Sequence, residues 1–194
     1  KAIFIKQSCE NLYLAVYACG ARKKVGKTVM SNKRYEVNTP GVSPVDRDVT
    51  KLLYVSTAKY GGDWHSLMHT HACTALFYLV GGMGQFKVAE KLIPVSPDDL
   101  VIVNPNVEHT EVSLNASPLE YIVLGVEGME FAADENGDRR YSAFNFHSGR
   151  EDILPYLRGM LREIEQKSAG YEVVCQDLLE ILVVKLMRHT DFSL

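Results

Sequence analysis

Three histidines in the middle of the chain have a spacing suited to binding chemistry. His69 and His71 are separated by one residue, and His109 stands near the start of a later apolar segment. Successive side chains of a strand point to opposite faces, so His69 and His71 would point the same way, with Cα atoms roughly 6–7 Å apart. A neutral imidazole can bind a divalent metal or accept a hydrogen bond from a small molecule. The sequence therefore predicts one site that contains all three imidazoles.

Residues near the histidines in sequence extend this predicted site. Trp64 offers a flat apolar wall, and His65 has the same strand parity as His69. Phe77 shares that parity in the next apolar run, so we expect an apolar cavity floor. The predicted ligand-binding residues are Trp64, His65, His69, His71, Phe77 and His109, of which His69, His71 and His109 are also the candidate metal ligands.

The segments that must position these residues have the pattern of β-strands. Apolar runs at 75–80 and 100–103 are separated by turn residues, with glycines gathered at 81–84. This arrangement is typical of strands joined by hairpins. Further strands are predicted at 52–57 and 121–126. Because no helical period separates these strands, the pattern favours an antiparallel sandwich or barrel over alternating strands and helices.

Beyond about residue 150 the apolar pattern becomes helical. Asp152 is a candidate N-cap of a first helix whose apolar stripe includes Ile153, Leu157 and Met160. A second helix, from about residue 172 to 189, is apolar around most of its circumference. Packing against a single neighbouring surface would leave part of this apolar arc exposed. We therefore predict that a partner subunit covers part of it. The predicted dimerisation residues are Leu179, Val183, Leu186 and Met187.

The central segment resembles the cupin superfamily. His69 and His71 form an H-x-H element, an apolar strand and a glycine turn follow, and Pro105 and His109 form a Pro-x-x-x-His element. More narrowly, HTHACTALFYLVGGMGQF followed by IPVSPDDLVIVNPNVEHTEV resembles the N-terminal ligand-binding domain of AraC-type transcriptional regulators. The resemblance implies a mainly β fold. Residues 1–147 would form an N-terminal arm and a cupin-like, double-stranded antiparallel β-barrel, and residues 148–194 a pair of α-helices.

Two positions depart from the cupin pattern. Metal-binding cupins usually place a glutamate three or four residues after H-x-H, where this chain has Ala75 and Leu76. The glycine common in the second motif is Asn106, which a turn tolerates because asparagine enters the left-handed conformation readily. Without the glutamate, we prefer imidazoles that hydrogen-bond a small molecule over a metal site. The metal alternative, with Zn, Ni, Mn or Fe as the cofactor, stays open.

The resemblance also implies a function. It makes this chain the effector-sensing and dimerisation domain of an AraC-type regulator, without enzyme activity, and a sugar is the family's best-known ligand class. Such regulators form homodimers and bind DNA through helix-turn-helix units. We find no such unit in the sequence, so we expect a longer protein that contacts DNA through a separate domain. The alternatives are a stand-alone metal-dependent cupin enzyme, an oxygenase or isomerase, and a carbohydrate-binding module without regulation.

The composition excludes several other classes. A formal charge of −3 and a pI near 6.1 lack the net positive charge that is typical of nucleic-acid-binding domains. No apolar run approaches the roughly 20 residues that span a bilayer. The four cysteines lie far apart and form no C-x-x-C pair, which favours reduced thiols. We therefore expect a cytoplasmic globular protein that does not bind membranes.

Overall fold

A computed structural model describes residues 46, 48–60, 67–114, 116–131, 137–138 and 140–190 of the chain. Trp64, His65 and the predicted N-terminal arm lie outside the described residues. The strands occur in the order β1 (Lys51–Lys59), β2 (Thr74–Gly81), β3 (Gly84–Val88), β4 (Lys91–Val95), β5 (Asp99–Val103), β6 (His109–Ser113), β7 (Glu120–Glu127) and β8 (Tyr141–Asn145). A 3-10 turn, His147–Gly149, and the helices α1 (Arg150–Gln166) and α2 (Tyr171–His189) follow.

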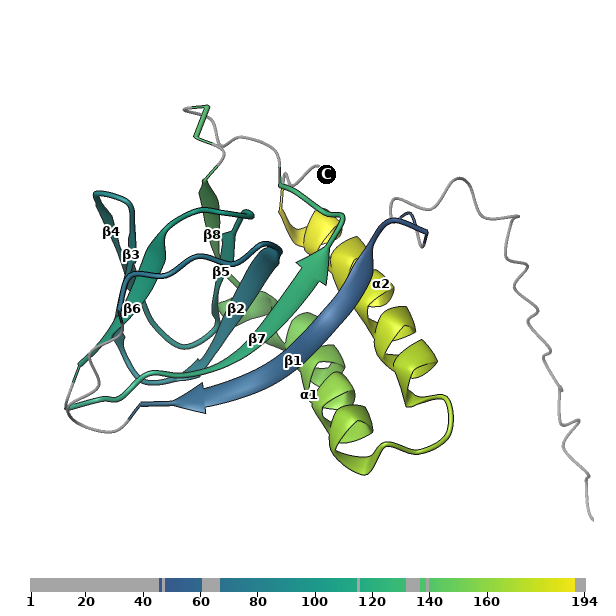
Figure 1. Cartoon of the computed structure of the whole chain (residues 1–194). Helices are drawn as coiled ribbons and strands as arrows, with labels where there is room; N and C mark the ends of the chain where they lie inside the picture. Colours follow the sequence, from purple (N-terminus) through teal and green to yellow (C-terminus); the bar gives the residue numbers. More distant parts are fainter. Residues whose placement is uncertain are drawn as a thin grey trace, which may run out of the picture. The chain divides into compact units, whose positions relative to one another are not determined.

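The strands form two antiparallel sheets. The larger sheet has the order β1-β7-β2-β5-β8, and the smaller sheet has the order β4-β3-β6. The helix pair lies against one side of the larger sheet, and the smaller sheet lies on the other side (Figure 1). The predicted fold, a mainly β architecture of antiparallel strands followed by two helices, is confirmed. Among the described residues, neither helix is long and apolar enough to span a membrane.

Alternation along β2 separates two hydrophobic cores. Phe77 and Leu79 pack among apolar side chains of the barrel interior, including Phe86 of β3. Leu76 and Tyr78, on the opposite face of β2, belong to the core shared with the helices. All of these side chains are almost fully buried. Adjacent residues of one strand therefore face the barrel interior and the helix pair, as the period of two requires.

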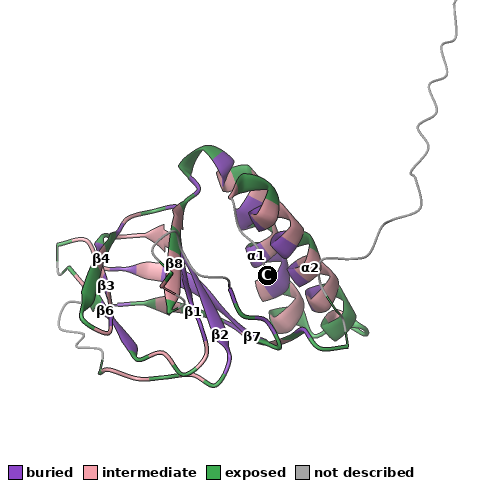
Figure 2. Ribbon diagram, turned by 90° about the horizontal axis from the view of Figure 1, so that it is seen from above, coloured by how far each residue is buried: buried purple, intermediate pink, exposed green. Residues whose placement is uncertain are grey.

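The apolar stripe predicted for the first helix is confirmed, but the predicted cap is wrong. Ile153, Leu157 and Met160 are buried in the core shared by the helices and the larger sheet. In Figure 2 both helices carry buried residues, coloured purple. The helix begins at Arg150, so Asp152 lies within its first turn. Its carboxylate instead accepts hydrogen bonds from Lys185 Nζ at 2.6 Å and His189 Nε2 at 3.1 Å. These ion pairs fasten α2 to the start of α1.

The residues predicted to form a dimer interface need correction. Leu179, Val183 and Leu186 are buried in the core between α2, α1 and the larger sheet, and Met187 packs partly buried against that core. Most of the wide apolar surface of α2 is covered within this chain, because the helix contacts both α1 and the larger sheet. The helix exposes other apolar side chains, among them Val174 at 40% and Ile181 at 42%.

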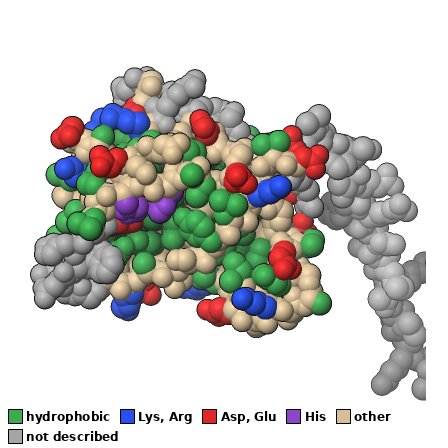
Figure 3. Space-filling model, in the orientation of Figure 1, with side chains coloured by type: hydrophobic (Ala, Val, Ile, Leu, Met, Phe, Trp, Pro, Cys, Tyr) green, Lys and Arg blue, Asp and Glu red, His purple; other side chains and the backbone are tan. Residues whose placement is uncertain are grey.

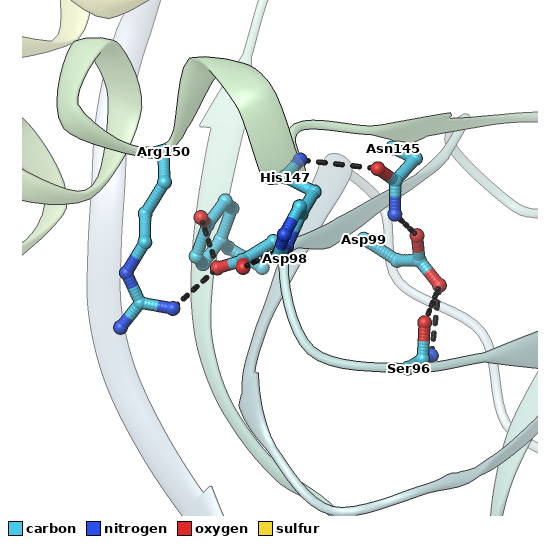
Figure 4. Close-up of polar contacts among 7 residues, drawn as sticks. Ser96, Asp98, Asp99, Asn145, His147 and Arg150 are labelled. Carbon is cyan, nitrogen blue, oxygen red and sulfur yellow. Dashed lines mark hydrogen bonds and ion pairs between the residues drawn. The ribbon is translucent and has the colours of Figure 1, made fainter.

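A buried carboxylate joins the barrel to the helices. Asp98, in the turn between β4 and β5, accepts hydrogen bonds from the Tyr78 hydroxyl at 3.0 Å and from Arg150 Nη1 at 2.6 Å. Its other oxygen lies 3.3 Å from His147 Nδ1. Figure 4 shows Asp98 between Arg150 and His147. Its backbone carbonyl accepts the Phe146 N–H. The Asp98 side chain thus joins β2, the 3-10 turn after β8 and the first residue of α1.

Candidate ligand-binding site

His69 and His71 do not lie on the predicted strand, whereas His109 begins β6, near the start of a strand as predicted. His69 and His71 belong to an irregular segment before β2, and only an isolated bridge pairs His69 with His109. In that bridge each backbone N–H donates to the other residue's carbonyl at 3.0 Å. The His71 carbonyl accepts the Asn106 N–H at 2.7 Å. The strand prediction is wrong here, but these backbone bonds hold the segment against the start of β6.

The three imidazoles nevertheless converge. Ring centroids are 4.5 Å apart for His69 and His109, 4.9 Å for His69 and His71, and 5.2 Å for His71 and His109. Asn106 makes this arrangement possible at the turn before β6, where its φ of 61° is a left-handed conformation that asparagine tolerates. The turn that presents His109 therefore also holds His71 through its backbone.

Backbone carbonyls fix the tautomers of two imidazoles. His69 Nδ1 lies 2.9 Å from the Leu67 carbonyl, and His109 Nδ1 lies 2.9 Å from the Val107 carbonyl. A carbonyl only accepts, so each Nδ1 must carry the hydrogen. In the neutral rings Nε2 then holds a lone pair. His109 is 1% exposed, and its Nε2 is buried without a hydrogen-bond partner among the described residues.

A cavity of about 590 Å³ opens beside the imidazoles, within the volume range of small-molecule sites. Phe77 lines the cavity and packs against His109 with ring centroids 5.7 Å apart. Histidine side chains reach the surface next to hydrophobic ones in the space-filling view (Figure 3). The described lining consists of Tyr54, Ser56, Tyr60, Leu67, His69, His71, Phe77, Glu111, Tyr121 and Val123.

One wall of the cavity carries a hydrogen-bonded chain that sequence reasoning missed. The Tyr121 hydroxyl donates to Glu111 Oε1 at 3.1 Å, and the Tyr60 and Tyr121 hydroxyls are hydrogen-bonded to each other. Glu111 is 3% exposed. Its signal in the sequence is its position two residues after His109, which gives both side chains the same strand parity. A carboxylate is therefore present near the imidazoles, but it comes from β6 and not from positions 75 or 76.

Burial sets the protonation of the pocket. Burial lowers the pKa of His71, and the neighbouring His69 lowers it further. Burial also lowers the pKa of His109, against a smaller opposing effect of its hydrogen bond to the Val107 carbonyl. For the phenols, burial raises the pKa of Tyr121 and of Tyr60. At neutral pH burial therefore favours neutral rings at His71 and His109 and protonated phenols at Tyr60 and Tyr121.

The three imidazoles are suitable ligands for a divalent metal, since neutral imidazole nitrogens are common metal ligands. One nitrogen from each ring lies within 4.8 Å of the others. Bonds of about 2.0–2.1 Å in a tetrahedral site would bring ligand nitrogens to roughly 3.4 Å, so the rings would have to approach one another. A metal held by His69, His71 and His109 would supply a Lewis acid.

Comparison with known families supports the resemblance seen in the sequence. The family described as AraC-like ligand binding domain matches residues 53–183, which is more than half of the chain. This chain belongs to that family. The match runs from β1 into α2 and so includes the pocket and most of the helix pair. No curated protein matches the AraC-like domain in a sequence search.

Solved structures similar to this AraC-like domain include regulators and cupins. ToxT from Vibrio cholerae, as the apo K231A variant, is 10% identical with a TM-score of 0.49, over 71% of this chain and 56% of ToxT. Wild-type ToxT bound to an unsaturated fatty acid is 11% identical with a TM-score of 0.45, over 76% of this chain and 56% of ToxT. A cupin protein from Bacteroides fragilis is 16% identical with a TM-score of 0.36, over 53% of this chain and 96% of that protein.

Proposed function

We propose that this AraC-like domain is the effector sensor of a cytoplasmic transcriptional regulator and that it performs no chemistry. A small molecule binds in the cavity beside His69, His71 and His109, and its binding changes how a separate DNA-binding domain acts. For this linkage the effector must bind one arrangement of the regulator more tightly than another.

The observation that carries the proposal is the Nε2 of His109, which is buried and has no hydrogen-bond partner among the residues that the structure describes. A buried polar atom without a hydrogen bond costs about 1–3 kcal/mol, so it is usually satisfied by a ligand, an ion or water. This nitrogen lies in a ring packed against His69 and His71, which both line the cavity. An effector with a suitable donor would recover that cost on binding.

A thermal-shift screen of sugars, amines, aromatic acids and common metabolites tests the proposal. A hit should stabilise the wild-type domain, and His71→Ala should remove most of the shift, because His71 lines the cavity and is only partly buried. His189→Ala is the matched control, since His189 lies on α2 and bonds to Asp152. A hit that stabilises both variants like the wild type would place the ligand elsewhere.

We also propose that the regulator forms a dimer. The proposed interface is the exposed face of α2, in place of the residues predicted from the sequence. Val174 and Ile181 are seven residues apart, so they lie on one face of the helix. Both are at least 40% exposed. A second copy of the family's helix pair is the partner that would cover this face.

Metal-dependent catalysis is the second candidate, because Glu111 adds a carboxylate to the wall near the imidazoles. We favour sensing over catalysis because Ala75 and Leu76 stand where metal-binding cupins usually have their glutamate. Metal analysis of the purified protein separates the two candidates and is described with the predictions below.

A further inference from the structure

A row of three paired residues crosses the larger sheet beside the pocket. Tyr54 of β1 is paired with Gly125 of β7, and Gly125 is paired with Ala75 of β2. Directly paired residues of neighbouring strands point to the same face of a sheet. Ala75 belongs to the core of the barrel interior, and Tyr54 packs against that core. Because Gly125 and Ala75 are the two smallest residue types, the row leaves room on its interior face.

The Tyr54 ring fills this room. A Cβ added to Gly125 would lie 2.1 Å from Tyr54 Cε1 and 2.6 Å from Tyr54 Cδ1. Nonbonded carbon atoms approach one another to roughly 3.5–4.0 Å, so a side chain at position 125 would displace the ring. The hydroxyl end of the ring interacts with the side chain of Cys73, the residue before β2. The ring therefore extends from β1 across β7 toward β2.

The backbone at Gly125 does not require a glycine. The residue lies inside β7, and it is not among the described glycines with a positive φ. Glycine weakens the interior of a strand, because it is flexible and has no side chain to pack. The role of a glycine at this position is therefore to leave space for the Tyr54 ring.

The position of the Tyr54 ring also sets the size of the ligand cavity, because Tyr54 lines it. With the ring over Gly125, the cavity has a volume of about 590 Å³. A side chain at position 125 would push the ring off β7, and the cavity is the open space beside it. Movement toward solvent would instead expose aromatic surface of a half-buried residue, which is less favourable.

We propose that Gly125 is a specificity-determining residue of the pocket. Because it lacks a side chain, the Tyr54 ring lies against the sheet and leaves the cavity open to a ligand that fills it. A larger residue at position 125 would restrict the pocket to smaller ligands. The inference rests on the proposed function, since it concerns the same pocket, but it depends on shape and not on the charge of any lining residue.

The neutral fluorescent probe N-phenyl-1-naphthylamine tests the space in the cavity. Gly125→Ala should weaken its binding about tenfold or more in a fluorescence titration, because the displaced ring occupies the space of the probe. Gly81→Ala is the matched control in β2, since its added Cβ would lie an ordinary 3.7 Å from Glu120 Cβ, and affinity should stay unchanged. Unchanged affinity in Gly125→Ala, or no saturable binding to the wild type, would overturn the proposal.

A Tyr54→Ala background separates displacement of the ring from other effects of the new methyl group. In that background Gly125→Ala should change probe affinity by less than about threefold, because no ring remains to be displaced. Circular dichroism melts verify that each variant folds. The same loss of affinity in both backgrounds would refute the inference, because it would come from a general distortion of the sheet.

NMR contacts of the Tyr54 ring provide a measurement that needs no probe. In the wild type the ring hydrogens should show nuclear Overhauser contacts to the α-hydrogens of Gly125. In Gly125→Ala these contacts should be replaced by contacts to side chains across the cavity, such as Phe77 and Tyr121. A ring that keeps its position or turns to solvent would contradict the proposal.

Failure of the sensing function gives a different pattern. A thermal-shift screen without hits, or with hits that His71→Ala leaves intact, would count against the pocket as the effector site. The displacement of the Tyr54 ring in Gly125→Ala would still be observed, since it depends on packing alone.

Discussion

Arg150 Nη1 donates to Asp98 Oδ1 at 2.6 Å and so joins the first residue of α1 to the turn between β4 and β5. The Tyr78 hydroxyl donates to the same oxygen from β2. Tyr78 directly follows Phe77, whose ring lines the ligand pocket on the other face of that strand. A shift of β2 on ligand binding would therefore act on the bonds that hold the helices to the barrel.

Asp98→Asn should lower the free energy of unfolding by about 1–2 kcal/mol, because it removes a charge from a buried hydrogen-bonded group. The effect should not be larger, because Arg150 is partly exposed and solvent screens its attraction to Asp98. Asparagine suits this position because Asp98 has a left-handed φ of 71°. Asp152→Asn, at a more exposed ion pair, should have a smaller effect. Chemical denaturation measures both. An equal loss in the two variants would contradict the role of Asp98 as a buried junction.

The stability of the metal-free domain should fall as pH decreases below about 6.5. Folding lowers the pKa of His71 and His109, so the unfolded chain binds more protons below its own histidine pKa near 6.5. The stability that these neutral rings contribute is fully present above pH 6.5 and is lost between that value and the lowered pKa of the folded state. Denaturation midpoints at pH 7.5 and 5.5 should differ less in His71→Gln than in the wild type; the same difference in both would contradict the assignment.

The corrected placement of α2 predicts unequal effects of two nearby substitutions on stability. Leu179→Ala should cost about 2–5 kcal/mol, since it opens a cavity in the core between the helices and the sheet. Ile181→Ala, on the exposed side, should change stability by less than about 0.5 kcal/mol. Equilibrium unfolding in urea compares the two. Similar costs would mean that α2 is packed with a different face inward.

The exposed face of α2 makes a separate prediction about assembly. If it is the dimer surface, Val174→Glu with Ile181→Glu should give a folded monomer, because two buried charges per subunit would be costly at an apolar interface. Light scattering reports the mass and circular dichroism the fold. A double variant with the mass of a wild-type dimer would exclude this face.

Metal content distinguishes sensing from catalysis. Protein that has never contacted a nickel resin should contain less than one equivalent of any first-row metal, because the imidazole set lacks the glutamate usual in metal-binding cupins. Elemental analysis of the wild type and His71→Ala provides the check. A full equivalent that is lost in His71→Ala, together with oxygenase or isomerase turnover, would favour the enzyme.

The strands and helices followed from the apolar pattern, because the continuous apolar run at 75–80 is a strand buried on both faces and the helical stripe with Ile153 buries one face of α1. The convergence of the histidines also followed from their spacing, although the actual support is an isolated bridge and a turn at Asn106. Glu111 could have been found from its parity with His109. The burial of Leu179 within the chain could not have been predicted, because the sequence of an apolar helix does not show whether the sheet or a second subunit covers its apolar surface. The hydrogen bond between the Tyr60 and Tyr121 hydroxyls joins residues 61 positions apart, which local sequence patterns cannot predict.

The most direct test of an effector site at the histidines is nitrogen NMR of the imidazoles in 15N-histidine-labelled, metal-free protein at pH 7.5. Without ligand, Nδ1 of His69 and of His109 should carry a hydrogen, as their bonds to the Leu67 and Val107 carbonyls require. Addition of a stabilising ligand from the thermal-shift screen should shift the Nε2 resonance of His109, an atom that is buried and has no hydrogen-bond partner among the described residues. Unchanged Nε2 resonances for all three pocket histidines at saturating ligand would contradict the account.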